Sequence, residues 1–189
     1  MRRKKKNYGA IIVSLFIAFI MVTSILGYIF GQDSGNDTVM YDGIKFVLTP
    51  EGWKTNYNGN TYIFSYTPSD LEDINFTEDI NFKGLLEIDL TYDVNSSYRE
   101  GIAEAIFRFS NNAEKQGIFI RQGFTGNNTY SVPIITCDDA TEFIPVIYYK
   151  EGNESNAENR GNCLVIESDE PNYFSAYTDL IAYKILGIM

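Results

Sequence analysis

The amino-acid sequence predicts an α+β protein in which one N-terminal transmembrane helix precedes a two-layer sandwich of a mostly antiparallel sheet with two main helices. Three observations predict this fold class. An uncharged apolar stretch, 8–30, follows a run of five basic residues. Segments with apolar residues at every second position, the period of strands, make up much of the remainder. Two segments with helical spacing interrupt them, and helices covering one face of an antiparallel sheet give this order of elements.

The apolar stretch has the length of a membrane span. Its roughly 23 residues would form a helix of about 34 Å, enough to cross a hydrocarbon core of about 30 Å. The basic residues before it predict that the N-terminus stays cytoplasmic and the C-terminal part leaves the cytoplasm. A cleaved signal peptide is the alternative, but its apolar core is usually shorter and ends in a small-x-small site, and Tyr28–Gln32 contains none. We therefore expect a single-pass protein of the cell membrane with four parts: a cytoplasmic basic tip (1–7), a transmembrane signal anchor in the lipid bilayer (8–31), a linker (32–40) and an extracytoplasmic α+β domain (41–189).

Charge is distributed very unevenly along the chain. Five of the fifteen basic residues lie in the tip, which leaves ten basic against twenty-five acidic residues after it. So acidic a domain would repel nucleic acid phosphates. The composition therefore argues against nucleic acid as a partner and favours cations or basic partners.

The first half of the domain reads as strands joined by tight turns. Ile44–Thr49 alternates apolar and polar residues, and so does Tyr62–Tyr66. Asn58-Gly59 between them is a strong hairpin signal. Thr67 as N-cap and Pro68 at the first helical position then predict a short helix.

The second half alternates strands with the two main helices. The Ser97–Glu100 segment matches a capping box, and helical spacing behind it predicts a helix over about 97–116 that ends at Gly117. A second helix is expected after Pro171, with Gly187 as its stop. Strands are expected at 86–92, 118–120, 132–136, 143–149 and 163–166, and 151–162 reads as a polar loop. The strand at 86–92 and its helix resemble the strand at 163–166 and its helix, so an internal duplication is one interpretation.

Two cysteines, Cys137 and Cys163, lie in the part expected outside the cytoplasm. We predict that they form a disulfide, which would close a loop of about 27 residues and contribute about 3–4 kcal/mol in the chain-entropy model. Two buried free thiols are the alternative.

Five N-glycosylation sequons follow the apolar stretch. Their acceptor residues are Asn36, Asn75, Asn95, Asn127 and Asn153. Their position agrees with a glycosylated surface protein. The alternative is chance, because the chain is rich in asparagine.

The side chains needed for most enzyme chemistry are missing from the sequence. The absence of histidine removes Ser-His-Asp and Cys-His catalysis and histidine-ligated metals. No Walker A loop or G-x-G-x-x-G motif supports nucleotide binding. We therefore predict no catalytic, cofactor-binding or metal residue and no cofactor.

Carboxylates remain as the one chemical option. One group is Asp138, Asp139 and Glu142, and another is Asp70, Glu72 and Asp73. Paired carboxylates can hydrolyse glycosides or bind Ca²⁺. Neither group has EF-hand spacing, and in so acidic a chain solvated surface is the plainer interpretation.

Aromatic residues make up 15% of the chain, which is high enough to suggest an exposed aromatic patch. Alternation directs some tyrosines outward, and the candidates are Tyr57, Tyr62, Tyr66, Tyr148 and Tyr149. The alternative is that these rings fill the core of a small β-rich domain.

The layout resembles short uncharacterised archaeal single-pass membrane-anchored proteins. The residues that carry the resemblance are the basic tip, Tyr41–Phe46, Phe64–Pro68, Cys137–Ala140 and Pro145–Ile147. The resemblance implies a location at a membrane and no particular activity.

These observations predict a binding or assembly module rather than an enzyme, anchored in the membrane and meeting a protein or glycan partner at the cell surface. A carboxylate-dependent hydrolase acting on cell-surface polymers is the alternative. A structural subunit whose span packs in a larger complex is a third hypothesis, based on a partial stripe of small and polar residues at Ser14, Ala18, Thr23 and Ser24.

Overall fold

The structure is a computed structural model that describes residues 8–31, 37–74, 76, 82 and 84–189, with the side chains of the first helix described from Ile12 to Ser24. It divides into two compact units, Met1–Asp37 and Thr38–Met189, which we treat separately.

The first unit contains one helix, α1 (Tyr8–Gly31). Among the residues that the structure describes, no helix is both long and apolar enough to cross a membrane. The predicted transmembrane helix, and with it the single-pass localisation with a cytoplasmic N-terminus and an extracytoplasmic domain, is therefore wrong.

The second unit begins with a four-stranded antiparallel sheet. Its strands β1 (Thr38–Tyr41), β2 (Ile44–Thr49), β3 (Gly52–Tyr57) and β4 (Asn60–Phe64) pair in chain order. The predicted hairpin is confirmed: Asn58 and Gly59 connect β3 to β4 with positive φ angles of 48° and 82°, the backbone that a two-residue turn of this kind requires. β1 begins at Thr38, within the range that the sequence suggested for the linker.

A second sheet of five strands follows. Its strands are β5 (Glu87–Tyr92), β6 (Phe119–Phe124), β7 (Val146–Glu151), β8 (Asn156–Arg160) and β9 (Cys163–Ser168), in the order β6-β5-β7-β9-β8. The first four strands of this order are parallel and only β8 is antiparallel. The α+β class is confirmed, but the prediction of one mostly antiparallel sheet is wrong, because long crossovers join these strands in place of hairpins.

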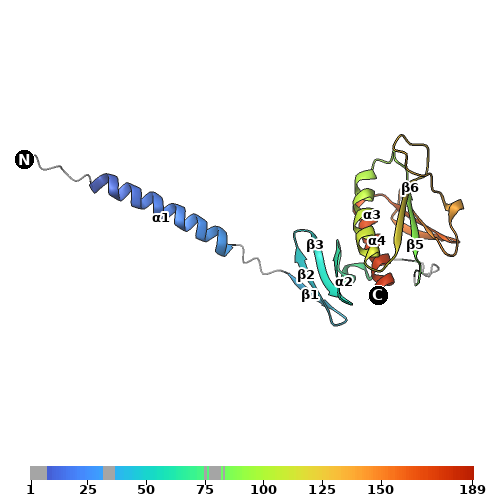
Figure 1. The fold of residues 1–189 in the computed structure, drawn as a ribbon, viewed down its shortest axis with the longest axis horizontal. Coiled ribbons are helices and arrows are strands. Elements are labelled where there is room, and N and C mark those ends of the chain that lie inside the picture. The colour runs from blue at the N-terminus through green and yellow to red at the C-terminus, as the bar shows by residue number, and fades with distance from the viewer. Residues whose placement is uncertain (1–7, 32–36, 75, 77–81, 83) are drawn as a thin grey trace, which may run out of the picture. The chain divides into compact units, whose positions relative to one another are not determined.

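The helices form a layer between the two sheets (Figure 1). This layer contains α3 (Arg99–Glu114) and α4 (Pro171–Leu186), which match the two predicted main helices. A short α2 (Pro68–Leu71) starts at the predicted Thr67 cap, and a 3₁₀ turn, η1, covers Cys137–Asp139. The unit therefore has three layers, sheet, helices and sheet, in place of the predicted two.

Helix α4 is the central element of the core. Its residues from Ala176 to Tyr183 are all buried, which is expected of a helix covered on more than one side. Tyr183 contacts Phe46 and Phe64 of the first sheet, and Phe174 contacts Tyr149 of the second. One hydrophobic cluster consequently includes both sheets and both helices.

Side chains from the helices satisfy the open edge of β4. The Asn112 amide accepts a hydrogen bond from the Ile63 N–H at 3.4 Å and donates one to the Ile63 carbonyl at 2.9 Å. The Lys115 ammonium donates to the carbonyl of Thr61 at 2.7 Å. These bonds replace a neighbouring strand, so the polar groups of this edge do not remain unpaired.

Asp179 of α4 binds the backbone just beyond the end of β4 in a similar way. Its carboxylate accepts hydrogen bonds from the N–H groups of Ser65 at 2.6 Å and Tyr66 at 3.0 Å, and the Tyr183 hydroxyl donates to the Tyr66 carbonyl at 2.7 Å. Burial raises the pKa of Asp179 to about 7, although these two N–H groups act in the opposite direction.

The face of the second sheet that points away from the helices has its own cover. A smaller buried cluster there contains Ile135, Val146, Cys163 and Val165. The predicted disulfide is confirmed: Cys137 and Cys163 are bonded, with Cα atoms 5.2 Å apart. Gly123 on β6 allows the segment that carries Ile135 to pack closely on the sheet, because a Cβ at position 123 would lie 2.6 Å from the Ile135 side chain.

Three local predictions are wrong. The strand expected at 132–136 is reduced to an isolated bridge between Phe124 and Ile134. The Ser97 capping box does not form, because α3 begins with Tyr98 as its N-cap and the hydroxyls of Ser96 and Ser97 bind Glu151 instead. The range 151–162 is not only a loop, since it contains β8. This strand lies at the edge of the sheet, where polar residues are tolerated, so the sequence lacks the alternation that marks other strands.

Replacing Asn112 with alanine tests the capped edge of β4. Asn112→Ala leaves the N–H and carbonyl of Ile63 without their partner, so we expect the free energy of unfolding to fall by about 2 kcal/mol in chemical denaturation. Asn111→Ala, at the adjacent exposed position, is the control and should change stability by less than about 0.5 kcal/mol. Equal effects of the two variants would contradict the role of Asn112.

The pH dependence of stability tests Asp179. The folded protein holds the Asp179 proton up to about pH 7, whereas the unfolded chain releases it near the ordinary value of 3.8. The folded state therefore binds more protons across this window, and this group makes stability fall as pH rises from about 4 to 7, by on the order of 4 kcal/mol. Denaturation of the wild type and Asp179→Asn over this pH range measures the effect as the difference between the two curves. A difference that does not change with pH would show that the carboxyl titrates normally.

Candidate functional site

The chain segments that follow β5 and β6 lie on opposite faces of the second sheet. After β5 the chain enters α3, which packs on the face of the second sheet that forms the main core. After β6 it crosses the other face, where the Thr91 hydroxyl donates to the carbonyl of Ile135 at 2.8 Å, before it reaches β7. In open parallel sheets, ligands bind outside the carboxyl ends of strands at such a reversal. The strand order reverses at β5, which lies between β6 and β7, so the carboxyl end of β5 is where this fold favours a site.

A hollow of about 820 Å³ lies at that place, and we call it the edge hollow. The ends of β5 and β6, the turn before α3 and the loop after β6 all contribute to it. It is lined by Tyr92, Val94, Asn95, Arg99, Phe124, Asn127, Asn128, Thr129 and Tyr130. Its size is within the range of small-molecule sites.

Three aromatic rings form one part of the edge hollow. Tyr92 and Phe124 end neighbouring strands in register, and their ring centroids lie 5.1 Å apart in an edge-to-face arrangement. Tyr130 from the following loop lies 6.1 Å from Phe124 and is 68% exposed. Burial raises the pKa of Tyr92, and Tyr130 raises it further, so its phenol is neutral near pH 7. The rings thus present an uncharged apolar surface with hydroxyl groups at its rim.

Amide and hydroxyl groups form another part of the edge hollow. Asn128 holds the loop itself, because its Oδ1 accepts hydrogen bonds from the N–H groups of Tyr130 and Val132 and its Nδ2 donates to the Val132 carbonyl. Asn127 and Thr129 make no side-chain hydrogen bond within the described part of the chain. Both can donate and accept, so they are available to a ligand with hydroxyl groups.

The N-terminus of α3 beside the hollow already has an anionic partner. The Glu151 carboxylate accepts hydrogen bonds from the Ser96 hydroxyl at 3.0 Å and from the N–H and hydroxyl of Ser97 at 3.0 and 2.9 Å. The two serine hydroxyls and the Ser97 N–H hold the pKa of Glu151 below its usual range. The Ser97 N–H is therefore not available to an external anion, unlike the corresponding groups at many helix N-termini.

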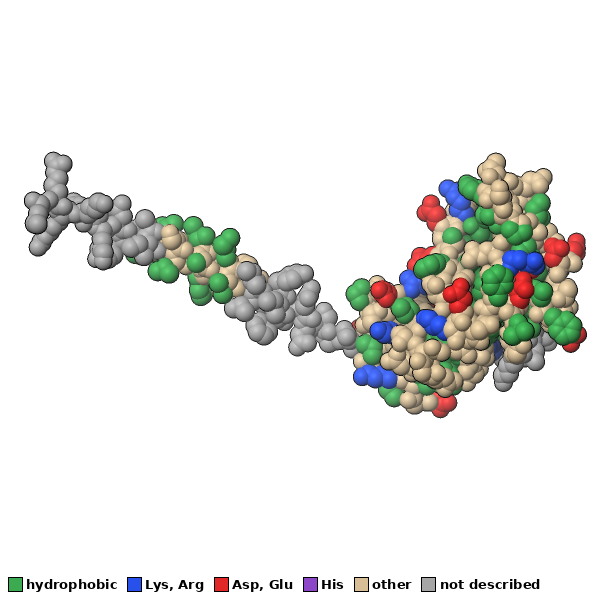
Figure 2. All heavy atoms as spheres, in the orientation of Figure 1, with side chains coloured by type: hydrophobic (Ala, Val, Ile, Leu, Met, Phe, Trp, Pro, Cys, Tyr) green, Lys and Arg blue, Asp and Glu red, His purple; other side chains and the backbone are tan. Residues whose placement is uncertain are grey.

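Two other hollows lie elsewhere on the unit. One of about 780 Å³ runs between α3 and the first sheet, beside Arg108, which donates to the Glu51 carbonyl. Another of about 740 Å³ contains Tyr66 and Tyr173 together with Asp70 and Asp169. Over the face in Figure 2, charged side chains of both signs are scattered among neutral ones. Neither hollow lies at the reversal of the strand connections.

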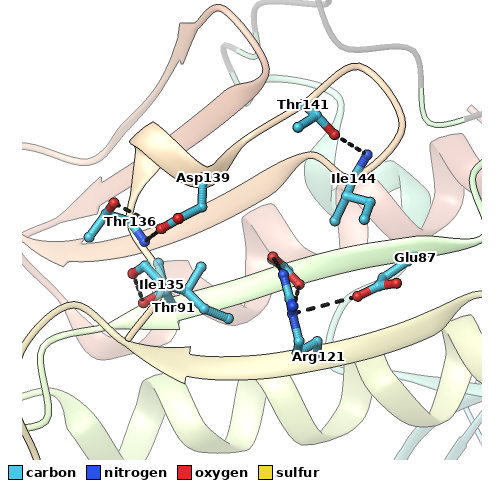
Figure 3. A network of polar contacts seen from close by, with 9 residues as sticks. Glu87, Thr91, Arg121, Ile135, Thr136, Asp139, Thr141 and Ile144 are labelled. Carbon is cyan, nitrogen blue, oxygen red and sulfur yellow. Dashed lines mark hydrogen bonds and ion pairs between the residues drawn. The ribbon is translucent and has the colours of Figure 1, made fainter. Parts of the chain in front are cut away.

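The predicted carboxylate groups lie apart from the edge hollow. Asp139 accepts hydrogen bonds from the N–H and hydroxyl of Thr136, which lower its pKa and make it the cap of η1 (Figure 3). Asp70 caps α2 through Thr67 in the same way. Asp138, Glu142 and Glu72 are exposed, and Asp73 lies with Asp70 in the hollow beside Tyr66. In the described part of the chain, no three acidic or cysteine side chains gather as a metal site.

A second polar network lies near Asp139 on the same face. The Arg121 guanidinium pairs with Asp89 at 2.8 Å and with Glu87 at 3.5 Å, as Figure 3 shows in part. Asp89 is fully buried, so this pair compensates its charge, and Arg121 is not free to bind a ligand.

The predicted aromatic patch does not form as a unit. Tyr62 and Tyr149 are fully buried in the core, so the core interpretation is correct for these two. Tyr57, Tyr66 and Tyr148 are half-buried and belong to different parts of the fold.

Three of the predicted glycosylation acceptors lie within the described residues, and Asn36 and Asn75 lie outside them. Asn95, Asn127 and Asn153 are exposed, which glycosylation would require. Asn95 and Asn127 line the edge hollow together, although 32 positions of sequence separate them. The use of these sequons stays a prediction.

Comparison with known proteins gave no match to any family model, curated protein or solved structure. The resemblance to archaeal membrane-anchored proteins stays a prediction.

The edge hollow was missed by the sequence analysis. Its residues come from two separate segments, 92–99 and 124–130, which only the parallel pairing of β5 and β6 brings together. Tyr92 and Phe124 at the ends of two strands were a signal, but they become informative only when the strands are known to run in the same direction.

Proposed function

We propose that this protein is a non-enzymatic binding module that takes a carbohydrate in the edge hollow. The observation that carries the proposal is the combination of three aromatic rings with unengaged amide and hydroxyl groups around one concavity. A sugar ring has the matching chemistry, because its C–H faces pack on aromatic rings and its hydroxyls both donate and accept hydrogen bonds.

The place of the hollow in the fold supports the same proposal. The rings of Tyr92 and Phe124 are held by paired strands, and Asn128 fixes the loop that carries Tyr130. Such a site is preorganised, so a ligand loses little free energy in ordering it. A protein partner, the other predicted class, presents flatter and larger surfaces than a hollow of about 820 Å³ accommodates.

The hydrolase hypothesis has less support among the described residues. It requires two facing carboxylates at a concave surface, one of them with a raised pKa. Asp70 and Asp169 line one hollow, but Asp70 caps α2 and Asp169 accepts a hydrogen bond from Ser155. In the part of the chain that the structure describes, the carboxyl whose pKa is raised is that of Asp179, which is buried and binds the N–H groups of Ser65 and Tyr66. We therefore favour binding without hydrolysis.

Replacing Tyr130 with alanine tests the proposed function. The ring is largely exposed, so the loss should affect binding more than folding. We expect Tyr130→Ala to weaken the binding of a neutral oligosaccharide found by screening the full chain by about tenfold, or about 1.4 kcal/mol, in calorimetric titration.

Phe143→Ala is the matched control, because Phe143 is a 77% exposed aromatic ring outside the edge hollow. It should bind the same oligosaccharide as tightly as the wild type does. The proposed function is wrong if no oligosaccharide of the screen binds, or if Tyr130→Ala and Phe143→Ala bind alike.

A further inference from the structure

Arg99 differs from every other arginine in the described part of the chain. Arg108 forms an ion pair with Glu104, Arg121 with Asp89, and Arg160 with Glu158. Arg99 forms no ion pair and no side-chain hydrogen bond with the described residues, although the chain contains twenty-five carboxylates. Arg99 is exposed, so its guanidinium is accessible to a ligand.

The position of Arg99 is electrostatically unfavourable for the protein alone. It is the first residue of α3, where the N–H groups of the helix already create positive potential. A basic residue there costs stability rather than adding it, so helix formation does not explain the choice of arginine. Glu151 reduces this potential through Ser96 and Ser97, and it forms no hydrogen bond or ion pair with Arg99.

Arg99 is also the one charged residue among those that line the edge hollow in the described structure. The other lining side chains are aromatic, aliphatic, amide or hydroxyl groups. The hollow therefore combines one cationic fork of five N–H donors with the aromatic and amide surface described above. A guanidinium with this geometry can bind a carboxylate through two parallel hydrogen bonds.

We propose that the edge hollow selects acidic sugars, with the Arg99 guanidinium binding the carboxylate of a uronic acid residue. This inference rests on the proposed function and specifies its ligand class. The sugar ring packs on Tyr130 and its neighbours, and the carboxylate pairs with a guanidinium that has no ion-pair partner among the described residues. Binding is reversible, and no covalent step is involved.

A nucleotide also combines a ring with an anionic group, so it is the rival ligand for this lining. The uronate is favoured because the Glu151 carboxylate already lies at the N-terminus of α3, where it binds Ser96 and Ser97 and would repel a phosphate group more strongly than a carboxylate. The overall excess of acidic residues would also repel a doubly charged phosphate more than a singly charged carboxylate.

A matched pair of probes separates the charge from the sugar. The full chain is titrated with an oligogalacturonate and with the same oligomer as its methyl ester, which keeps the sugar rings but removes the carboxylate charge. We expect the acid to bind at least tenfold more tightly than the ester, and this preference to shrink as the salt concentration rises.

Variants of Arg99 then assign the preference to this side chain. Arg99→Gln should bind the acid and the ester about equally, and Arg99→Lys should retain part of the preference because lysine keeps the charge but loses the planar fork. Lys54→Gln, which removes one exposed positive charge on β3, is the control and should keep the full preference. Thermal unfolding checks that Arg99→Gln remains folded.

The outcomes distinguish this inference from the proposed function. If the acid and the ester bind equally to the wild type, the selection of acidic sugars is wrong while the carbohydrate site stands. If neither binds but uridine monophosphate does, and Arg99→Gln abolishes that binding, the ligand is a nucleotide and both proposals are overturned. If Arg99→Gln keeps the full preference for the acid, another residue reads the carboxylate and the role of Arg99 is wrong.

Discussion

The burial of α4 between two sheets is the constraint on which the second unit depends. A helix covered on both sides must provide partners for every polar group that it places in the interior. Asp179 and Tyr183 meet this requirement by binding the backbone just beyond β4. Asn112 of α3 does the same for Ile63, so the first sheet is held to the helices by directed bonds as well as by apolar contact. These side chains set the position of the sheet, which apolar packing alone would leave free to slide.

The same layering determines where a ligand can bind. The helices cover one face of the second sheet, and the segment tied by Cys137 and Cys163 covers part of the other. A hollow then forms where the two connections separate, at the carboxyl ends of β5 and β6. The edge hollow is a consequence of strand order, and its chemistry depends on which residues end those strands.

Local rules predicted much of this fold. The spacing of apolar residues predicted α3 and α4, and Asn58-Gly59 predicted its hairpin. These rules were less informative for side chains that can either form a site or cap a helix. Asp70 and Asp139 looked like chemistry but cap short helical turns through a threonine three positions earlier. This Thr-x-x-Asp pattern is visible in the sequence and would have identified both as caps.

By itself the sequence determined the main helices, most strands, the hairpin turn and the disulfide pair, because each depends on neighbours in the chain or on the only two cysteines present. Only the tertiary structure decided that the second sheet is mostly parallel, that α4 lies in the middle, and that Arg99, which has no ion pair among the described residues, lines the same hollow as Tyr130. The physical reason is that alternation records which face of a strand is buried and carries no information about the direction of its neighbour. A site assembled from the ends of two parallel strands therefore becomes visible only after the strands are paired.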